Sequence, residues 1–228
     1  MTDRIRKVLR AHKDARVFLS TVSGVASTKK EMISYFDRMT DVDIITTKSF
    51  QVLPNPGNRE PVICQTGAGN FGNSVGLRNP GLEAVLPEIA ELRKKGLCKL
   101  LNVSLSASSP QDFITLIRAF DPYADSVELN FSCPHAAAGF GASIGSDITT
   151  ATEYVRQIRA AFPEQQSALI IKLTPNVDNI GQIARSLIEA GADGIAAINT
   201  AGPLRYTLEG TDIPILNNSL GGKGGASG

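Results

Sequence analysis

Short apolar runs alternate along the chain with longer segments whose apolar residues recur every three to four positions. The short runs have the length of buried parallel strands, and the longer segments have the period of amphipathic helices. The expected strands span residues 17–21, 43–47, 99–104, 126–130, 168–173 and 194–199. The expected helices span residues 27–39, 79–96, 109–120, 147–162 and 177–192. This alternation predicts an α/β fold with a parallel sheet covered by helices.

Polar side chains stand at or near the carboxyl ends of five of these strands. They are Lys48, Asn102, Asn130, Lys172 and Asn199. A (β/α)8 barrel assembles its site from the ends of several strands, whereas a doubly wound sheet usually binds ligands at one switch point. The pattern therefore favours a (β/α)8 TIM barrel. About six of the eight βα units are present, so residues 1–228 are expected to form a single barrel domain that is C-terminally incomplete or is completed by another chain.

Composition and charge exclude several classes of function. The 23 Lys and Arg residues are balanced by 22 Asp and Glu residues, whereas a nucleic-acid-binding protein would show a basic stripe. No run approaches the roughly 20 apolar residues of a membrane span. Residues 1–16 lack the apolar core of a signal peptide and are expected to form a short amphipathic helix, with a basic membrane-surface helix as the alternative. These features predict a cytoplasmic protein that binds neither nucleic acid nor membrane.

The three cysteines differ in their settings. Cys64, Cys98 and Cys133 form no CxxC pair, which argues against a disulfide framework and for a reducing compartment. Cys64 and Cys98 are expected to be buried and inert. Cys133 stands in the stretch ELNFSCPH, between a strand and a glycine-rich loop. A metal site formed with His135 is not expected, because no further ligands cluster nearby.

Seven motifs in order carry a resemblance to a known family. They are TKSFQVLPNPGNREP, NSVGLRNPGLE, LNVS, ELNFSCPH, IIKLTPNV, EAGADGIAAINTAGP and LGGKGGASG. Over residues 17–228 the chain resembles the class 1 dihydroorotate dehydrogenases, FMN-dependent barrel enzymes of pyrimidine synthesis. NSVGLRNPGLE resembles the branch that works with an iron-sulfur flavoprotein subunit and NAD. The resemblance implies an oxidoreductase acting on a CH–CH group, with FMN as cofactor, dihydroorotate as substrate and a homo- or hetero-oligomeric assembly.

The resemblance also assigns roles to individual residues. Cys133 matches the general base that takes the C5 proton while hydride passes from C6 to the flavin, and a thiol can be tuned for that task. Lys48 and Lys172 match two active-site lysines beside the flavin, Lys172 near the ring edge that gains negative charge on reduction. Substrate contacts are expected from Asn73, Asn130, Asn199 and Thr200, since carboxamides complement a cyclic ureide. Further flavin contacts are expected from Ser23, Gly24, Asn102, Asn130, Gly221 and Gly222.

One position departs from the family pattern. His135 follows Cys-Pro where dihydroorotate dehydrogenases usually have asparagine. Together with the loop of residues 136–147, it resembles the FMN domain of dihydropyrimidine dehydrogenases, which reduce uracil and thymine. In that alternative, His135 contacts the pyrimidine and Cys133 acts as general acid. A third interpretation is a non-catalytic scaffold subunit, because the family binds the FMN phosphate in loops after strands seven and eight, and weak flavin binding is expected without them.

Overall fold

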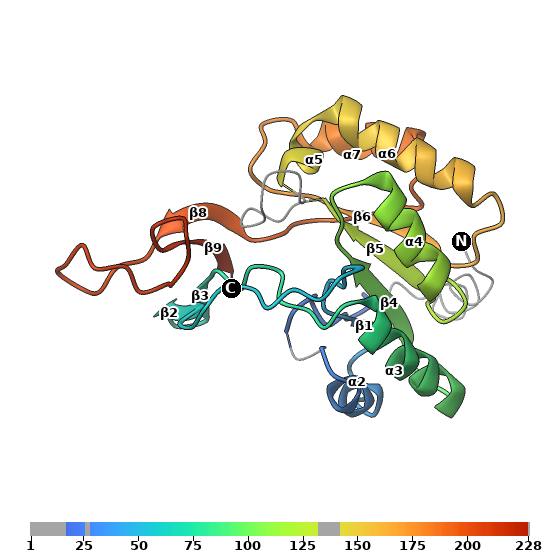
Figure 1. The fold of residues 1–228 in the computed structure, drawn as a ribbon, viewed down its shortest axis with the longest axis horizontal. Helices are drawn as coiled ribbons and strands as arrows, with labels where there is room; N and C mark the ends of the chain where they lie inside the picture. The colour runs from blue at the N-terminus through green and yellow to red at the C-terminus, as the bar shows by residue number, and fades with distance from the viewer. Residues whose placement is uncertain (1–16, 26–27, 132–141, 228) are drawn as a thin grey trace.

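A curled parallel sheet forms the centre of the fold in the computed structural model, which describes residues 17–25, 28–131 and 142–227 (Figure 1). Its strand order is β1-β4-β5-β6-β7. The expected first strand appears as one parallel bridge, from Ser20 to Ile44 beside β1. The predicted α/β fold, a (β/α)8 barrel of which part is present, is therefore confirmed; the curled sheet with its helices forms a half-barrel. The strands are β1 (Ile44–Thr46), β4 (Leu100–Leu105), β5 (Ser126–Asn130), β6 (Ala168–Lys172) and β7 (Gly194–Ala196).

Helices cover the outer face of this sheet, and each of the five predicted helices is present. Ser109 and Asp147 cap two of them by accepting hydrogen bonds from N–H groups of the first turn. In the described residues, no helix is long and apolar enough to cross a membrane. The helix expected within residues 1–16 lies outside the described part of the chain. The helices are α2 (Lys30–Asp37), α3 (Leu82–Lys95), α4 (Pro110–Phe120), α5 (Ala142–Ser146), α6 (Ile148–Ala161) and α7 (Ile180–Glu189).

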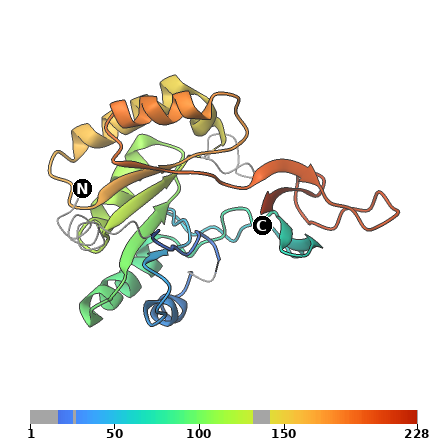
Figure 2. The same ribbon diagram turned by 180° about the vertical axis from the view of Figure 1, so that it is seen from behind.

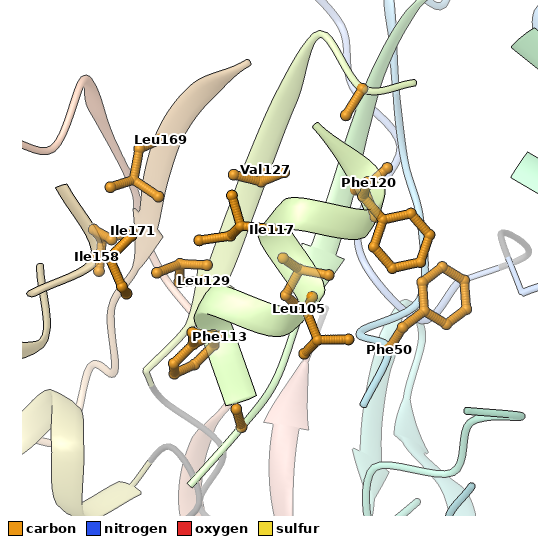
Figure 3. Close-up of a cluster of buried hydrophobic side chains, with 14 of the residues drawn as sticks. Phe50, Leu105, Phe113, Ile117, Phe120, Val127, Leu129, Ile158, Leu169 and Ile171 are labelled. Atoms are coloured by element: carbon orange, nitrogen blue, oxygen red, sulfur yellow. The ribbon is translucent and has the colours of Figure 1, made fainter. Parts of the chain in front are cut away.

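The hydrophobic core lies between the sheet and these helices (Figure 3). Alternate residues of β4, β5 and β6 point outward into it, because successive side chains of a strand face opposite sides. The rings of Phe50 and Phe120 stack there with centroids 5.9 Å apart. This alternation leaves the other half of each strand facing the inside of the half-barrel. The outward residues are Leu101, Val103, Leu105, Val127, Leu129, Leu169 and Ile171.

Two aspartates, one just before β5 and one just before β7, make the same set of contacts. Asp125 accepts hydrogen bonds from the N–H of Leu101 at 2.8 Å and from Nη2 of Arg93 at 2.7 Å. Asp193 accepts from the N–H of Leu169 at 2.8 Å and from Nη2 of Arg159 at 2.5 Å. Each arginine comes from a helix that covers the sheet. These contacts therefore fix α3 to β4 and α6 to β6 at the end of the sheet opposite the polar residues.

A second, antiparallel sheet projects from the half-barrel (Figures 1 and 2). Its order is β2-β3-β9-β8, and it is built from the segments that follow the carboxyl ends of β1 and β7. The sequence predicted none of these strands, since they are short, rich in glycine and largely exposed. Cys64 is buried in this sheet as expected, but Cys98 is exposed, contrary to expectation, because it lies in the turn between α3 and β4. The strands are β2 (Ile63–Gly67), β3 (Asn70–Asn73), β8 (Ala201–Arg205) and β9 (Lys223–Ser227).

Candidate active site

Polar side chains occupy the inner face of β4 and β5 at every second position. Asn102 and Ser104 of β4 stand in register with Ser126 and Glu128 of β5. Asn130, the last residue of β5, stands in register with Lys172, the last residue of β6. Parallel strands in register turn the same side chains to the same face. The inner face of β4 and β5 is therefore polar, and at the carboxyl ends of β5 and β6 it ends in an amide and an ammonium group.

The Asn130 and Asn199 side chains form a pair at the carboxyl ends of the strands. Nδ2 of Asn199 donates to Oδ1 of Asn130 at 3.2 Å. The backbone N–H of Thr200 donates to Oδ1 of Asn199 at 2.8 Å and holds that carboxamide in place. The structure thus brings together Asn130, Lys172, Asn199 and Thr200. A paired carboxamide surface offers donors and acceptors to a flat heterocycle.

Ser23 and Gly24 lie against the segment that follows β1. The hydroxyls of Ser23 and Ser49 are 3.2 Å apart, and Nδ2 of Asn130 donates to Oγ of Ser49 at 3.4 Å. Gly24 has φ +89°, and a Cβ atom there would stand 3.3 Å from Nζ of Lys48. Glycine at this position keeps the approach to the ammonium group open. The loop, Lys48 and Asn130 therefore meet at one place.

A cleft of about 850 Å³ opens beside Lys48 and Gly24. This volume lies within the range of ligand sites. Cationic and anionic side chains line its outer part, among them Lys29, Arg78 and Glu88. Within the described residues, no group of three or more His, Cys, Asp or Glu side chains could hold a metal ion.

Asn102 lies deeper than the sequence indicated. It is the third residue of β4 and is 7% exposed. Its Nδ2 donates to Oγ1 of Thr46 at 3.1 Å and to Glu128 at 3.4 Å, and its Oδ1 accepts from Ser126 at 2.7 Å. Both N–H groups of the carboxamide are therefore satisfied by the protein. Contact with a flavin would use the remaining lone pair of Oδ1.

Three predicted site residues are placed elsewhere in the fold. Asn73 ends β3 in the second sheet, where its Nδ2 donates to the carbonyl of Gly225 at 3.4 Å. Gly221 and Gly222 precede β9, and the N–H of Gly222 donates to Oδ1 of Asn218 at 3.2 Å. Their contacts are thus within the projecting sheet and its loops. Cys133 and His135 lie outside the described residues.

The sequence analysis missed three inner-face residues, Ser49, Ser104 and Glu128. All three are buried, with exposures of 3%, 0% and 6%. The signal was present in the strands themselves, since Asn102 and Ser104 alternate with leucine and valine, and so do Ser126, Glu128 and Asn130. Polar residues at a period of two inside an apolar strand mark a second, polar face.

The inner face fits the ring of the FMN that the resemblance implies. The supporting observation is the Gly24 position, where a Cβ atom would crowd Lys48. The residues that would hold the ring are Ser23, Gly24, Lys48, Asn130 and Lys172. Fixed cations at the edge of a flavin tune its reduction.

Comparison with known proteins places the chain in a family. Residues 11–228 match the family described as dihydroorotate dehydrogenase. A dihydroorotate dehydrogenase of Eimeria tenella, solved in complex with ferulenol, superposes with a TM-score of 0.74 at 17% sequence identity. The match covers 92% of this chain and 61% of that one. It shows the shared fold.

Curated relatives share a higher identity. The chain is 40% identical over 181 residues to the catalytic subunit of dihydroorotate dehydrogenase B (NAD(+)) of Methanothermobacter thermautotrophicus, covering 79% of this chain and 57% of that protein. The protein of the same name from Pyrococcus abyssi is 34% identical over 207 residues, with coverages of 91% and 66%. The chain thus spans 57% to 66% of the length of these two relatives. From the family match and these identities, we conclude that the chain belongs to the dihydroorotate dehydrogenase family.

Proposed function

We propose that this chain binds FMN on the inner face of its half-barrel and oxidises dihydroorotate to orotate. One observation carries the proposal: the Asn199 carboxamide donates to that of Asn130 at 3.2 Å, beside the in-register Lys172. These groups come from the ends of β5 and β6 and from the segment after β7, and they meet where a (β/α)8 barrel carries its chemistry. Family membership supplies the reaction class.

The chain's own residues divide the work of this reaction. Asn130 and Asn199 hold the pyrimidine by hydrogen bonds, and Lys48 and Lys172 supply positive charge beside the flavin ring. Bound FMN would accept the hydride that leaves C6 of dihydroorotate. Cys133 takes the C5 proton on its sulfur. Cys133 follows Asn130 by three residues in the sequence.

A second candidate function is the reduction of uracil or thymine. The residue that favours it is His135, which stands where dihydroorotate dehydrogenases usually have asparagine. In that direction Cys133 would deliver a proton to C5, and the imidazole of His135 would donate to a pyrimidine carbonyl. The names of the curated relatives favour the first candidate.

A partner subunit belongs to the proposal. The relatives are named as catalytic subunits of NAD(+)-linked enzymes. We infer that an iron-sulfur flavoprotein subunit carries electrons from the reduced chain to NAD. The reduced protein should then be reoxidised slowly by NAD alone and quickly when that subunit is added.

Anaerobic reduction of the FMN-loaded protein separates the candidates. Dihydroorotate should bleach the flavin band near about 450 nm. Dihydrouracil, which tests the second candidate in its reverse direction, should leave the band unchanged. Bleaching by dihydrouracil alone would favour pyrimidine reduction. A folded protein that takes up no FMN would instead support a scaffold role.

A further inference from the structure

Glu128 is a buried carboxylate that no step of the proposed reaction uses. It lies on the inner face of β5 and is 6% exposed. Oγ of Ser104 donates to it at 3.2 Å, and Nδ2 of Asn102 donates to it at 3.4 Å. Within the described residues, no Lys or Arg nitrogen lies within 4.0 Å of this carboxylate. The hydrogen bonds printed for this carboxyl group therefore come from a hydroxyl and a carboxamide, both neutral donors.

The carboxylate determines the direction of a chain of hydroxyl groups. Ser104 gives its one hydroxyl proton to Glu128. In the 2.9 Å contact between Ser49 and Ser104 either hydroxyl could donate, so Ser49 must be the donor. The proton of Ser49 is then used, and Ser23 must donate in the 3.2 Å contact between Ser23 and Ser49. The chain runs from Ser23 through Ser49 and Ser104 to Glu128.

This direction reaches the Asn130 carboxamide. Because the proton of Ser49 points to Ser104, its oxygen can only accept from Asn130. The amide nitrogen of Asn130 therefore faces Ser49, and its oxygen faces Nδ2 of Asn199. Both contacts agree on one orientation. In a reversed chain Ser49 would accept from Ser104, and its own proton could point to Ser23 or to Asn130. A proton that points to Asn130 would favour the flipped carboxamide.

We propose that Glu128 is a positioning residue that sets the orientation of the Asn130 carboxamide through Ser104 and Ser49. Its relevance to pyrimidine binding rests on the proposed function, but the orientation itself does not. Glu128→Gln tests this directly, because a glutamine amide has the same size and can donate to Ser104. With the amide as donor, the hydrogen bonds through Ser104 and Ser49 could run in the opposite direction.

Nuclear magnetic resonance of the ligand-free protein gives the first readout. The side-chain amide signals of Asn130 are assigned by their loss in Asn130→Asp. Glu128→Gln and Ser104→Ala should both shift these signals and speed their exchange with water. Thr46→Val is the matched control. It removes a hydrogen-bond partner of Asn102, the other residue that donates to Glu128, and should leave the Asn130 signals unshifted. Unshifted Asn130 signals in folded Glu128→Gln would overturn the proposal.

Orotate binding to the FMN-loaded protein gives the second readout. Glu128→Gln and Ser104→Ala should each weaken orotate about 10-fold, which corresponds to one hydrogen bond of about 1.4 kcal/mol. The double variant should be no weaker than either single variant, because both cut the same chain. Additive losses would contradict the proposal. Wild-type protein that binds neither FMN nor orotate would refute the proposed function, and the resonance test would still decide the role of Glu128.

Discussion

Asn199 and Asn130 are 69 residues apart in the chain and are joined by a 3.2 Å hydrogen bond between their side chains. The bond links the carboxyl end of β5 to the segment after β7. Neither strand pairs with the other, since β6 lies between them. The contact therefore depends on the curvature of the sheet, which brings non-adjacent strand ends together.

Removing one member of this pair should weaken ligand binding more than folding. Asn199→Ala deletes a donor to Asn130 and an acceptor for the N–H of Thr200. We expect orotate affinity in the FMN-loaded protein to fall about 10- to 100-fold, since a lost hydrogen bond with an unpaired partner costs about 1–3 kcal/mol. Asn70→Ala, at the exposed first residue of β3 in the second sheet, is the control. Equal affinities in the two variants would exclude the pair from the ligand site.

Acid stability should depend on Asp193. Burial raises the pKa of its carboxyl group. The N–H of Leu169 and the guanidinium of Arg159 together lower this pKa by more than burial raises it, so the net shift is downward. Because the pKa is lower in the folded state, ionised Asp193 stabilises the fold at pH values above 3.8, the ordinary pKa of an aspartate. This stabilisation is lost as the pH falls through the pKa of the folded state. Asp193→Asn should therefore lower the free energy of unfolding by about 1–3 kcal/mol at neutral pH.

The pH profile of that difference is the measurement. Urea unfolding of wild type and Asp193→Asn should show a gap that is constant from pH 7 to about 5 and narrows below about pH 4. Asp178→Asn, at an exposed position, is the control and should leave stability nearly unchanged. A gap that stays constant down to pH 2 would mean that the charge of Asp193 does not stabilise the fold.

Tyr206 should tolerate the loss of its hydroxyl. Its Oη is buried and has no hydrogen-bond partner among the described residues, and its ring fills the space beside Gly72. Burial, and then the charge of Cys64, raise the pKa of Tyr206, so the phenol stays protonated at neutral pH. Tyr206→Phe should leave the free energy of unfolding unchanged or raise it by about 1 kcal/mol.

Tyr154→Phe is the matched comparison for Tyr206→Phe. The Tyr154 hydroxyl donates to the carbonyl of Ser108 at 3.0 Å, so its removal should cost about 0.5–1.5 kcal/mol. Denaturant midpoints of the two variants should move in opposite directions or differ clearly. A larger loss for Tyr206→Phe than for Tyr154→Phe would show that the Tyr206 hydroxyl has a partner in solution.

The sequence predicted the parallel sheet well because its strands are buried on the helix side. LLNVSL and SVELN carry outward Leu and Val residues that identify them as strands, and the structure places them as β4 and β5. The edge strands β1 and β7 have three residues each, shorter than predicted. An edge strand has a neighbour on one side only, so fewer residues meet the hydrogen-bond pattern of a strand.

The second sheet and the inner polar network could not be predicted in the same way. β9 reads KGGAS, a sequence without apolar alternation, and pairs with β3 about 150 residues earlier in the chain. Two strands so far apart in the sequence pair only because the folded structure brings them together, and local sequence patterns do not encode this. Glu128 lies in the middle of its strand, away from the strand ends that predict a barrel site, although its period-two spacing from Asn130 marks the inner face.

The most direct test is the rate at which dihydroorotate reduces the FMN-loaded protein, measured by rapid mixing. Wild type should bleach the flavin band, and Cys133→Ala should do so about 10² to 10⁴ times more slowly while still binding FMN, because it lacks the general base. Cys98→Ser, a change at an exposed cysteine, should match wild type. Equal rates for wild type and Cys133→Ala, or no bleaching of flavin bound to wild type, would contradict the account.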